Sequence, residues 1–291
     1  MTASPQTQPT HVWRAVLGWG FLLWVIATVV LALTRDEIIL PSVVLIGSFL
    51  VPVATIFWFI DHDHETELGE RRLVTAFFVA GVLGMICSAA LEIWLAPHRL
   101  LPNLWVGLIE EAAKGFGVYF MSRGLQRLEV RDGILLGTVV GLGFGAFEAA
   151  GYTLTSGLQG GELSLHRMIS EELLREIIAP FCHGIWTGLL GAAIFSSRRR
   201  LTWRVVGTYL GVSILHTIWD SASNAAVVLT VLIHGPDEAR SALSPSALPF
   251  PADVEPQWLF GTLQWTLMII IAIIGVVLVR RLWHSRAAVP A

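Results

Sequence analysis

The chain has 291 residues, of which 54% are hydrophobic and only 14% are charged, and its formal net charge is -3. Soluble domains usually carry about 25% charged residues, so this composition excludes an ordinary soluble protein, and the slight negative charge gives no reason to expect a nucleic-acid partner. Composition therefore predicts an integral membrane protein whose first partner is the lipid bilayer.

Apolar segments long enough to cross a bilayer follow one another along the chain, since a spanning helix needs roughly 20 apolar residues. They are Trp13–Leu33, Ile38–Ile60, Leu73–Leu95, Leu101–Met121, Gly133–Leu154, Ile177–Phe195, Val205–Ile233 and Trp258–Val279. We therefore predict an all-α fold, a polytopic membrane bundle of about eight transmembrane helices. The seventh segment is long enough to tilt or to end early.

A single transmembrane domain accounts for almost the whole chain. We expect residues 1–12 to be a disordered N-terminal tail, residues 13–286 to form the domain, and residues 287–291 to be a C-terminal tail. Residues 101–224 are the part of the domain that carries polar motifs. Residues 235–256 are rich in Pro, Ser and Ala, which predicts a flexible outer loop.

Basic residues set the predicted orientation, because Lys and Arg concentrate in cytoplasmic loops. With eight spans and a cytoplasmic N-terminus, most of the 19 Lys and Arg residues fall on the cytoplasmic side, including Arg198–Arg200 and Arg280–Arg281. Both termini are therefore predicted to be cytoplasmic.

Residues 159–176 contain both apolar and charged side chains in an amphipathic pattern. The pattern predicts an amphipathic helix on the outer membrane surface.

Ionisable side chains within the spans are the strongest indication of function, because a charge in hydrocarbon is costly and rare. Here they gather in the fourth to seventh spans as pairs four residues apart, so each pair lies on one face of its helix. The pairs are Glu110 with Lys114, Glu148 with Tyr152, His183 with Thr187, and His216 with Asp220, and Glu111 and Asn224 stand beside them. Because successive spans run in opposite directions, all four pairs are expected at the same depth, in the outer half of the membrane. This common depth predicts a single site.

The fifth span also carries a glycine at every fourth position, at Gly133, Gly137, Gly141 and Gly145. Small residues at this spacing make a flat face that lets another helix approach closely. We interpret this face as a packing surface that helps to draw Glu148 into the site.

The residue types of this cluster are those of a site that activates water. A carboxylate beside Lys114 suits a general base, and a histidine can polarise a carbonyl or stabilise an oxyanion. A zinc site needs three His, Glu or Asp ligands with water in a fourth position, and His183, His216 and Glu111 would supply it, with Glu148 or Asp220 as the alternative acid. The sequence contains no HExxH motif, so zinc-dependent and metal-free catalysis both stay open.

Two other functions compete with hydrolysis. Buried carboxylates and histidines also form the proton relay of a proton-coupled transporter, although such a path must reach both faces, and the cytoplasmic halves of the fourth to seventh spans look apolar. A non-enzymatic membrane scaffold is the third interpretation. Any one of these polar residues alone is more often a structural contact than a catalyst, so it is their combination on four helices that favours an enzyme.

At these positions the chain resembles the PrsW family of intramembrane proteases. The family's EExxK motif is matched by Glu110, Glu111 and Lys114, and its FExxxY motif is matched by Phe147, Glu148 and Tyr152. A histidine followed by Thr and Gly is matched by His183, Thr187 and Gly191, and the final histidine with an acid one turn on is matched by His216 and Asp220. The resemblance extends over about residues 101–224.

The resemblance implies hydrolysis of peptide bonds within or beside the bilayer of the bacterial cytoplasmic membrane. The implied substrate is a membrane-anchored protein, and members of the family act on anti-sigma factors. The family is similar to the CAAX prenyl protease and bacteriocin-immunity superfamily, which implies Glu110 or Glu111 as general base. Glu148, His183 and His216 would then surround the water and the oxyanion, with Asp220 as an orienting acid. Lys114, Tyr152, Thr187 and Asn224 would support the site.

Overall fold

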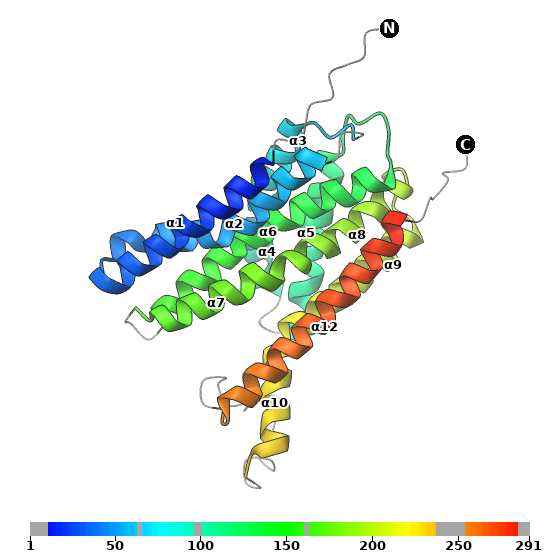
Figure 1. Cartoon of the computed structure of the whole chain (residues 1–291). Coiled ribbons are helices and arrows are strands. Elements are labelled where there is room, and N and C mark those ends of the chain that lie inside the picture. The colour runs from blue at the N-terminus through cyan, green and yellow to red at the C-terminus, as the bar shows by residue number, and fades with distance from the viewer. Residues whose placement is uncertain (1–10, 63–65, 96–100, 160–162, 237–253, 285–291) are drawn as a thin grey trace.

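The computed structural model describes residues 11–62, 66–95, 101–159, 163–236 and 254–284, and among them it contains helices and no strand (Figure 1). This confirms the all-α prediction. Most of the predicted N-terminal tail, the outer loop and the C-terminal tail lie outside the described residues.

The helices of the described residues have the following bounds. They are α1 Val12–Thr34, α2 Leu40–His62 after a short 3-10 turn at Glu37–Ile39, α3 Glu70–Thr75, a π-helical turn at Ala76–Ala80, α4 Gly81–Leu95, α5 Pro102–Met121, α6 Val130–Leu158, α7 Leu165–Ile178, a 3-10 turn at Ala179–Phe181, α8 His183–Ser196, α9 Trp203–Asp220, α10 Ala222–His234 and α12 Gln257–His284.

Six helical stretches of the described residues are long and apolar enough to cross a membrane. They are Val12–Thr34, Glu37–His62, Glu70–Leu95, Val130–Leu158, Leu165–Ser196 and Gln257–His284, and they correspond to the predicted spans one, two, three, five, six and eight. The chain is therefore a multi-pass membrane protein. The count of eight and the cytoplasmic location of both termini stay predictions, although α1 begins and α12 ends toward the same end of the bundle (Figure 1).

The predicted fourth span corresponds to α5, and α9 forms the first part of the predicted seventh span; neither α5 nor α9 is among the six apolar stretches. These two helices carry Glu110, Glu111 and Lys114 on α5, and His216 and Asp220 on α9. These residues of the candidate site therefore make the two helices more polar than the other spans. Both helices pack against others in the bundle, α5 on α4, α6 and α9, and α9 on α5 and α8.

The predicted seventh span does not form one continuous helix. Helix α9 ends at Asp220, a turn follows at Ser221, and α10 begins at Ala222 and diverges from the bundle beside the start of α12 (Figure 1). The interruption falls in the polar run Asp220–Asn224, where short Ser, Asn and Asp side chains compete with the helical hydrogen bonds of the backbone.

The segment that was predicted to lie on the membrane surface is helical but belongs to the bundle. Helix α7 packs against α2 and α6, and Pro180 lies in the short turn that leads from it into α8. Its Met168 and Glu172 are fully buried, and the indole N–H of Trp24 donates a hydrogen bond of 3.1 Å to the Glu172 carboxylate. The amphipathic pattern was correct, but the partner of the helix is protein.

The glycine face of the fifth span packs on α8, as the spacing predicted. A side chain at Gly137 or Gly141 would overlap the backbone carbonyl of Thr187 or of His183, and one at Gly133 would lie 2.5 Å from the carbonyl oxygen of Gly191. The two backbones therefore touch, with no room for a Cβ on α6. In lipid, where apolar burial between helices gains little, such close van der Waals packing is a main source of association.

The apolar core lies in the halves of the helices that are away from the polar residues. It joins Phe77, Val118, Leu136, Leu190 and Phe195, all nearly inaccessible to solvent. This bears on the transporter interpretation, because the described core between α5, α6 and α8 is an apolar block.

Candidate active site

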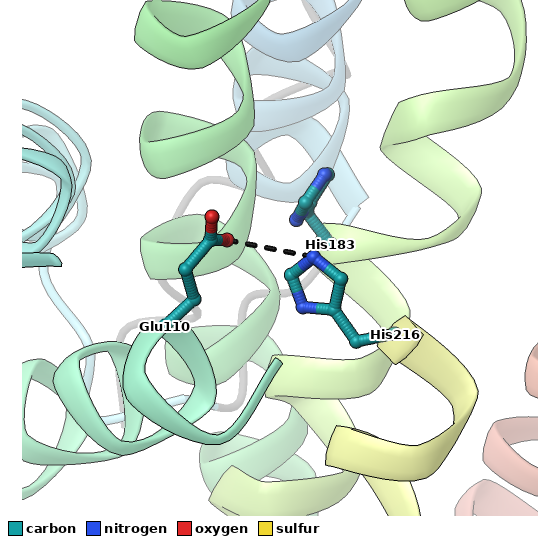
Figure 2. Close-up of side chains that lie close together, drawn as sticks. All are labelled: Glu110, His183 and His216. Carbon is teal, nitrogen blue, oxygen red and sulfur yellow. Dashed lines mark ion pairs between the residues drawn. The ribbon is translucent and has the colours of Figure 1, made fainter. Parts of the chain in front are cut away.

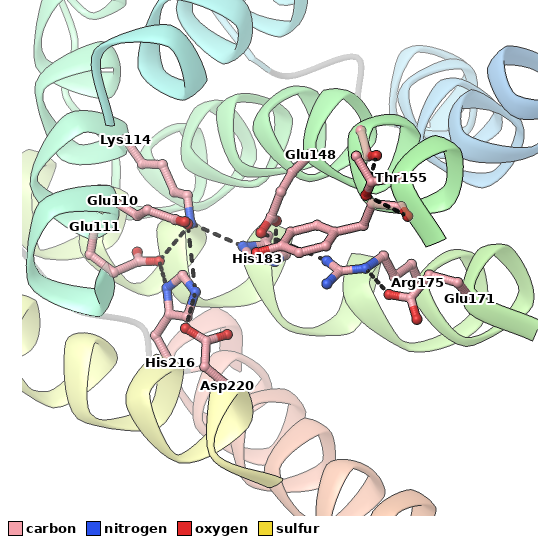
Figure 3. Close-up of polar contacts among 12 residues, drawn as sticks. Glu110, Glu111, Lys114, Glu148, Thr155, Glu171, Arg175, His183, His216 and Asp220 are labelled. Atoms are coloured by element: carbon pink, nitrogen blue, oxygen red, sulfur yellow. Dashed lines mark hydrogen bonds and ion pairs between the residues drawn. The ribbon is translucent and has the colours of Figure 1, made fainter. Parts of the chain in front are cut away.

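Helix α5 contributes two glutamates and a lysine that contact one another. The Lys114 ammonium donates to Glu110 Oε2 at 3.1 Å, to Glu111 Oε1 at 2.9 Å and to His183 Nδ1 at 2.9 Å (Figure 3). These three acceptors match the three N–H groups of an ammonium. The lysine is fully buried, so the site contains one fixed positive charge that is completely hydrogen-bonded by protein.

The setting of Lys114 explains how a lysine is tolerated there. A buried ion is strongly destabilised unless opposite charges and hydrogen bonds compensate for its lost hydration. Two carboxylates supply the compensation, and the ammonium also lies 4.1 Å from the centre of the Phe144 ring. The positive charge in turn stabilises two glutamates that would otherwise repel each other inside the bundle.

His216 of α9 is held by carboxylates on both of its ring nitrogens. Its Nδ1 lies 3.0 Å from Glu111 Oε1, and its Nε2 lies 3.5 Å from Glu110 Oε2 and 3.5 Å from Asp220 Oδ2. A hydrogen bond donated from Nδ1 to Glu111 leaves the Nε2 lone pair free for a metal or a proton. Glu111 is thus in the position of an orienting carboxylate.

His183 at the start of α8 has the corresponding arrangement with α6. Its Nε2 lies 3.1 Å from Glu148 Oε2, while its Nδ1 faces Lys114. The Glu148 carboxylate is also 3.7 Å from the Arg175 guanidinium of α7. The two histidine rings lie 5.1 Å apart between centroids, so the two halves of the site face each other.

Three of these side chains form a group with the composition of a metal site (Figure 2). Glu110, His183 and His216 are buried, and one ligand atom from each lies within 4.8 Å of the others. Both histidines agree with the predicted metal ligands, but the carboxylate of the group is Glu110 in place of Glu111. Glu111 instead lies 3.0 Å from Nδ1 of His216, whereas Glu110 lies 3.5 Å from Nε2 of the same ring.

The hydrogen bonding of the cluster fits a metal ligand set. The Nε2 atoms of His183 and His216 are buried and lack a hydrogen bond, although each lies near a carboxylate. Buried polar atoms are otherwise nearly always paired. Two imidazoles and one carboxylate are also the donor set of several zinc hydrolases, which keep a fourth position for water.

Aromatic side chains close the site on one side. The Trp186 ring is fully buried, with its centroid 5.8 Å from that of His183 and 5.2 Å from that of His216. Trp219 packs edge-on against it. This wall keeps the lower dielectric of the bundle around the histidines, which strengthens every charge interaction in the site.

The predicted site residues do not all meet. Glu110, Glu111, Lys114, Glu148, His183, His216 and Asp220 form one network. Tyr152 is half exposed and lies beside this network, with the Arg175 guanidinium 3.6 Å from its ring centre. Thr187 is buried at the α6–α8 contact without a hydrogen bond, and Asn224 is exposed beyond the Ser221 turn with no recorded contact to the cluster.

Arg175 is the site neighbour that sequence reasoning missed. It bridges Glu148 and Glu171, with its Nε 2.6 Å from Glu171 Oε1. It was grouped with the charged face of a surface helix. Its position could have identified it as a site neighbour. Arg175 lies about two helical turns before His183, at the edge of the apolar segment that contains α8.

An open groove reaches the network from one flank. It has a volume of about 400 Å³ and is lined by α5, α8 and α9, with Gly115, Leu190 and Tyr209 along its wall. Glu111 lies at its inner end, and Arg199 and Arg200 lie at the other. The Oε2 atom of Glu111 is buried without a hydrogen bond.

Comparison with known proteins gives one match. The family model described as PrsW family intramembrane metalloprotease matches residues 69–236, which is more than half of the chain. No curated protein and no solved structure matches the chain.

Proposed function

The chain belongs to the PrsW family of intramembrane metalloproteases, and from this premise we propose that its α5–α6–α8–α9 cluster hydrolyses peptide bonds of a membrane-anchored protein within the outer half of the bilayer. That the chain is a membrane protease follows from the family. The observation that carries the finer proposal is the buried group of Glu110, His183 and His216, with the Glu111 carboxylate at Nδ1 of His216 and Glu148 beside His183.

We propose Glu110, His183 and His216 as the ligands of one divalent metal, with zinc as the ion whose preferences this donor set meets. When bound, such a metal lowers the pKa of a coordinated water and polarises the scissile carbonyl. A metal held by Glu110 and His183 would compete with Lys114 for these side chains, and Glu111 would remain as a partner of the ammonium.

The other charged residues then have separate tasks. Glu111 holds His216 through Nδ1, as orienting carboxylates do for metal-bound histidines. Glu148 is partly accessible, at 14% of its side chain, and accepts the proton of the attacking water. We place the general base at Glu148, because Glu110 is a proposed ligand and Glu111 holds His216. The proton that Glu148 accepts from the water is then given to the leaving amine. Asp220, at 25% exposure, lies 3.5 Å from His216 at the edge of the site.

The groove that ends at Glu111 is the proposed approach for substrate. Its wall is apolar, it opens along the side of the bundle, and it leads to the network. A membrane-embedded segment can therefore reach the site without leaving hydrocarbon. An anti-sigma factor is a candidate substrate only through the resemblance to the family.

Newly formed peptide termini in membranes test the proposal. Cells that carry wild type, Glu110→Gln or the exposed control Glu70→Gln are compared at matched expression. We expect termini that map in or beside the spans of one or two single-pass proteins, present in wild type and control and absent with Glu110→Gln. Identical termini in all three would reject the proposed cleavage.

Metal analysis of the purified protein tests the ligand assignment. We expect one zinc per chain in wild type and in Asp220→Asn, and its loss in both His183→Ala and His216→Ala. Retention of stoichiometric metal by either histidine variant would contradict the ligand set, while the cleavage experiment would still stand.

A further inference from the structure

A second and larger groove lies on the other side of α9 and does not border the network. It has a volume of about 850 Å³, within the range of about 300–1,000 Å³ that small-molecule sites occupy. Helices α8, α9 and α12 form its walls. None of the seven charged residues in the network lines it, and the buried layer of Trp186, Leu189, Val212 and Trp219 separates it from the site.

The groove exists because small side chains on α8 and α9 face α12. Ala192, Ala193 and Gly211 lie on these faces, and a Cβ added at Gly211 would meet nothing within 4 Å. Small residues between membrane helices usually bring backbones together. Here an open apolar space remains between these faces and α12.

Two guanidinium groups line one end of the groove. Arg204 comes from the first turn of α9 and Arg281 comes from the last turn of α12, and both are exposed. Within the described part of the chain, neither has a recorded ion pair or hydrogen bond. The groove therefore combines an apolar body with an unneutralised positive end, at the side that the basic residues predict to be cytoplasmic.

We propose that this groove binds an anionic phospholipid, with its acyl chains along α8, α9 and α12 and its headgroup between Arg204 and Arg281. Basic pockets between transmembrane helices near the cytoplasmic surface recognise anionic headgroups in this way. A peptide substrate fits poorly, because the Trp186 layer keeps it from the catalytic residues. A second copy of the chain fits poorly as well, because it would bring like-charged arginines to the same end.

Lipid binding to the purified full-length chain tests the proposal without any cleavage. Palmitoyl-oleoyl phosphatidylglycerol and phosphatidylcholine with the same chains are titrated separately into detergent-solubilised protein, and bound lipid is counted by native mass spectrometry. We expect wild type to bind phosphatidylglycerol more tightly. Each basic side chain near an anionic headgroup contributes a factor of about five in affinity, so Arg204→Gln with Arg281→Gln should lose about 25-fold.

Matched variants separate this site from general lipid contact. The control pair Arg71→Gln with Arg280→Gln removes the same charge from exposed positions outside the groove. Gly211→Trp fills the groove, whereas Leu210→Trp places the same ring on an adjacent exposed position outside it. We expect the control pair and Leu210→Trp to bind as wild type, and Gly211→Trp to lose both lipids.

Equal binding of the two lipids by wild type would overturn the proposal, as would unchanged binding after both Arg204 and Arg281 are replaced. The Gly211→Trp variant gives a second, independent outcome if the double arginine variant does not fold. Failure of the lipid site leaves the proposed protease site untouched, since no residue is shared between the two.

Discussion

The α6–α8 pair and the α5–α9 pair each bring at least one glutamate and one histidine to the site, but their helix contacts differ. In the first pair, Gly133, Gly137 and Gly141 of α6 lie directly on the backbone of α8. In the second pair only one such contact is found among the described residues, at Gly107 of α5, where a Cβ would lie 2.7 Å from a backbone carbonyl of α9. Side-chain hydrogen bonds add to it, from Asn103 to Ser221 just after α9 at 3.0 Å and from Tyr209 to the Leu108 carbonyl at 2.9 Å.

The difference teaches how the two histidines are fixed. His183 lies where the backbones of the first pair touch, because a Cβ at Gly141 would overlap its carbonyl. His216 lies beside the single glycine contact of the second pair, has carboxylates near both ring nitrogens, and belongs to a helix that borders two open grooves. Steric packing resists small displacements more than individual hydrogen bonds do, since each of these is worth only about 0.6 kcal/mol on average in membrane helices. The α5–α9 pair, with one such glycine contact, is therefore the less tightly packed of the two pairs.

Replacing a glycine at the steric contact should have the largest effect. Gly141→Leu forces α6 away from His183, because even a Cβ has no space there. We expect loss of folded protein or destabilisation by more than about 3 kcal/mol, the scale of severe overpacking. Yield and thermal unfolding in detergent measure it. Gly151→Leu is the control on the same helix, where a Cβ meets nothing within 4 Å; equal stability of the two variants would contradict the contact.

Removing the carboxylate behind His216 should have the next largest effect. Glu111→Gln takes away one charge from Lys114 and replaces the carboxylate that orients His216 by a neutral amide, whose oxygen is a weaker acceptor. Loss of such an orienting group lowers metal affinity or activity by about 10–100-fold. Metal titration and cleavage rate measure this, with exposed Glu67→Gln as control. Full metal affinity in Glu111→Gln would show that Glu111 does not orient His216.

Removing the cation behind Glu148 should have a smaller effect. Arg175→Gln deletes an ion pair at 3.7 Å and leaves the α6–α8 packing intact. We expect kcat to fall about tenfold with metal content unchanged, as for groups that act on a site through a neighbour. Arg167→Gln, an exposed arginine on the same helix, should keep wild-type kcat. An unchanged kcat in Arg175→Gln would show that Arg175 does not influence catalysis through Glu148.

Removing one hydrogen bond of the α5–α9 pair should have the smallest effect. Tyr209→Phe deletes the hydroxyl that donates to the Leu108 carbonyl, which should cost about 0.6 kcal/mol of stability, the average for such a bond between membrane helices. Tyr119→Phe is a control on the exposed face of α5. A loss as large as that of Gly141→Leu would mean that the two helix pairs do not differ in the way described.

The sequence was sufficient for the class of fold and for most members of the site. Charges in apolar spans are so costly that Glu110, Glu148, His183 and His216 could be selected from their environment alone, and their spacing placed each pair on one helix face. The glycine spacing likewise predicted a close helix contact. The motifs also indicated the PrsW family, and the family model that matches residues 69–236 confirms it.

What the sequence could not give was the choice of partners. Spacing along one helix suggested Asp220 as the acid for His216, but Glu111 of another helix is nearer, at 3.0 Å against 3.5 Å. It also suggested Glu111 as metal ligand, where the structure groups Glu110 with the histidines. Such choices depend on how helices rotate and cross, and a periodic pattern on one helix contains no information about that rotation.

The sequence by itself thus determined that this protein is a helical membrane protein with buried charges on four successive segments. The reason is that hydrocarbon favours an apolar side chain at each position, so every charged residue in a span stands out. Only the tertiary structure decided which carboxylate serves which histidine, that α7 packs in the bundle with Arg175 beside Glu148, and that α9 ends at Asp220. These features arise from contacts between segments distant in the chain, where the geometry of packing selects among several polar partners of similar chemistry.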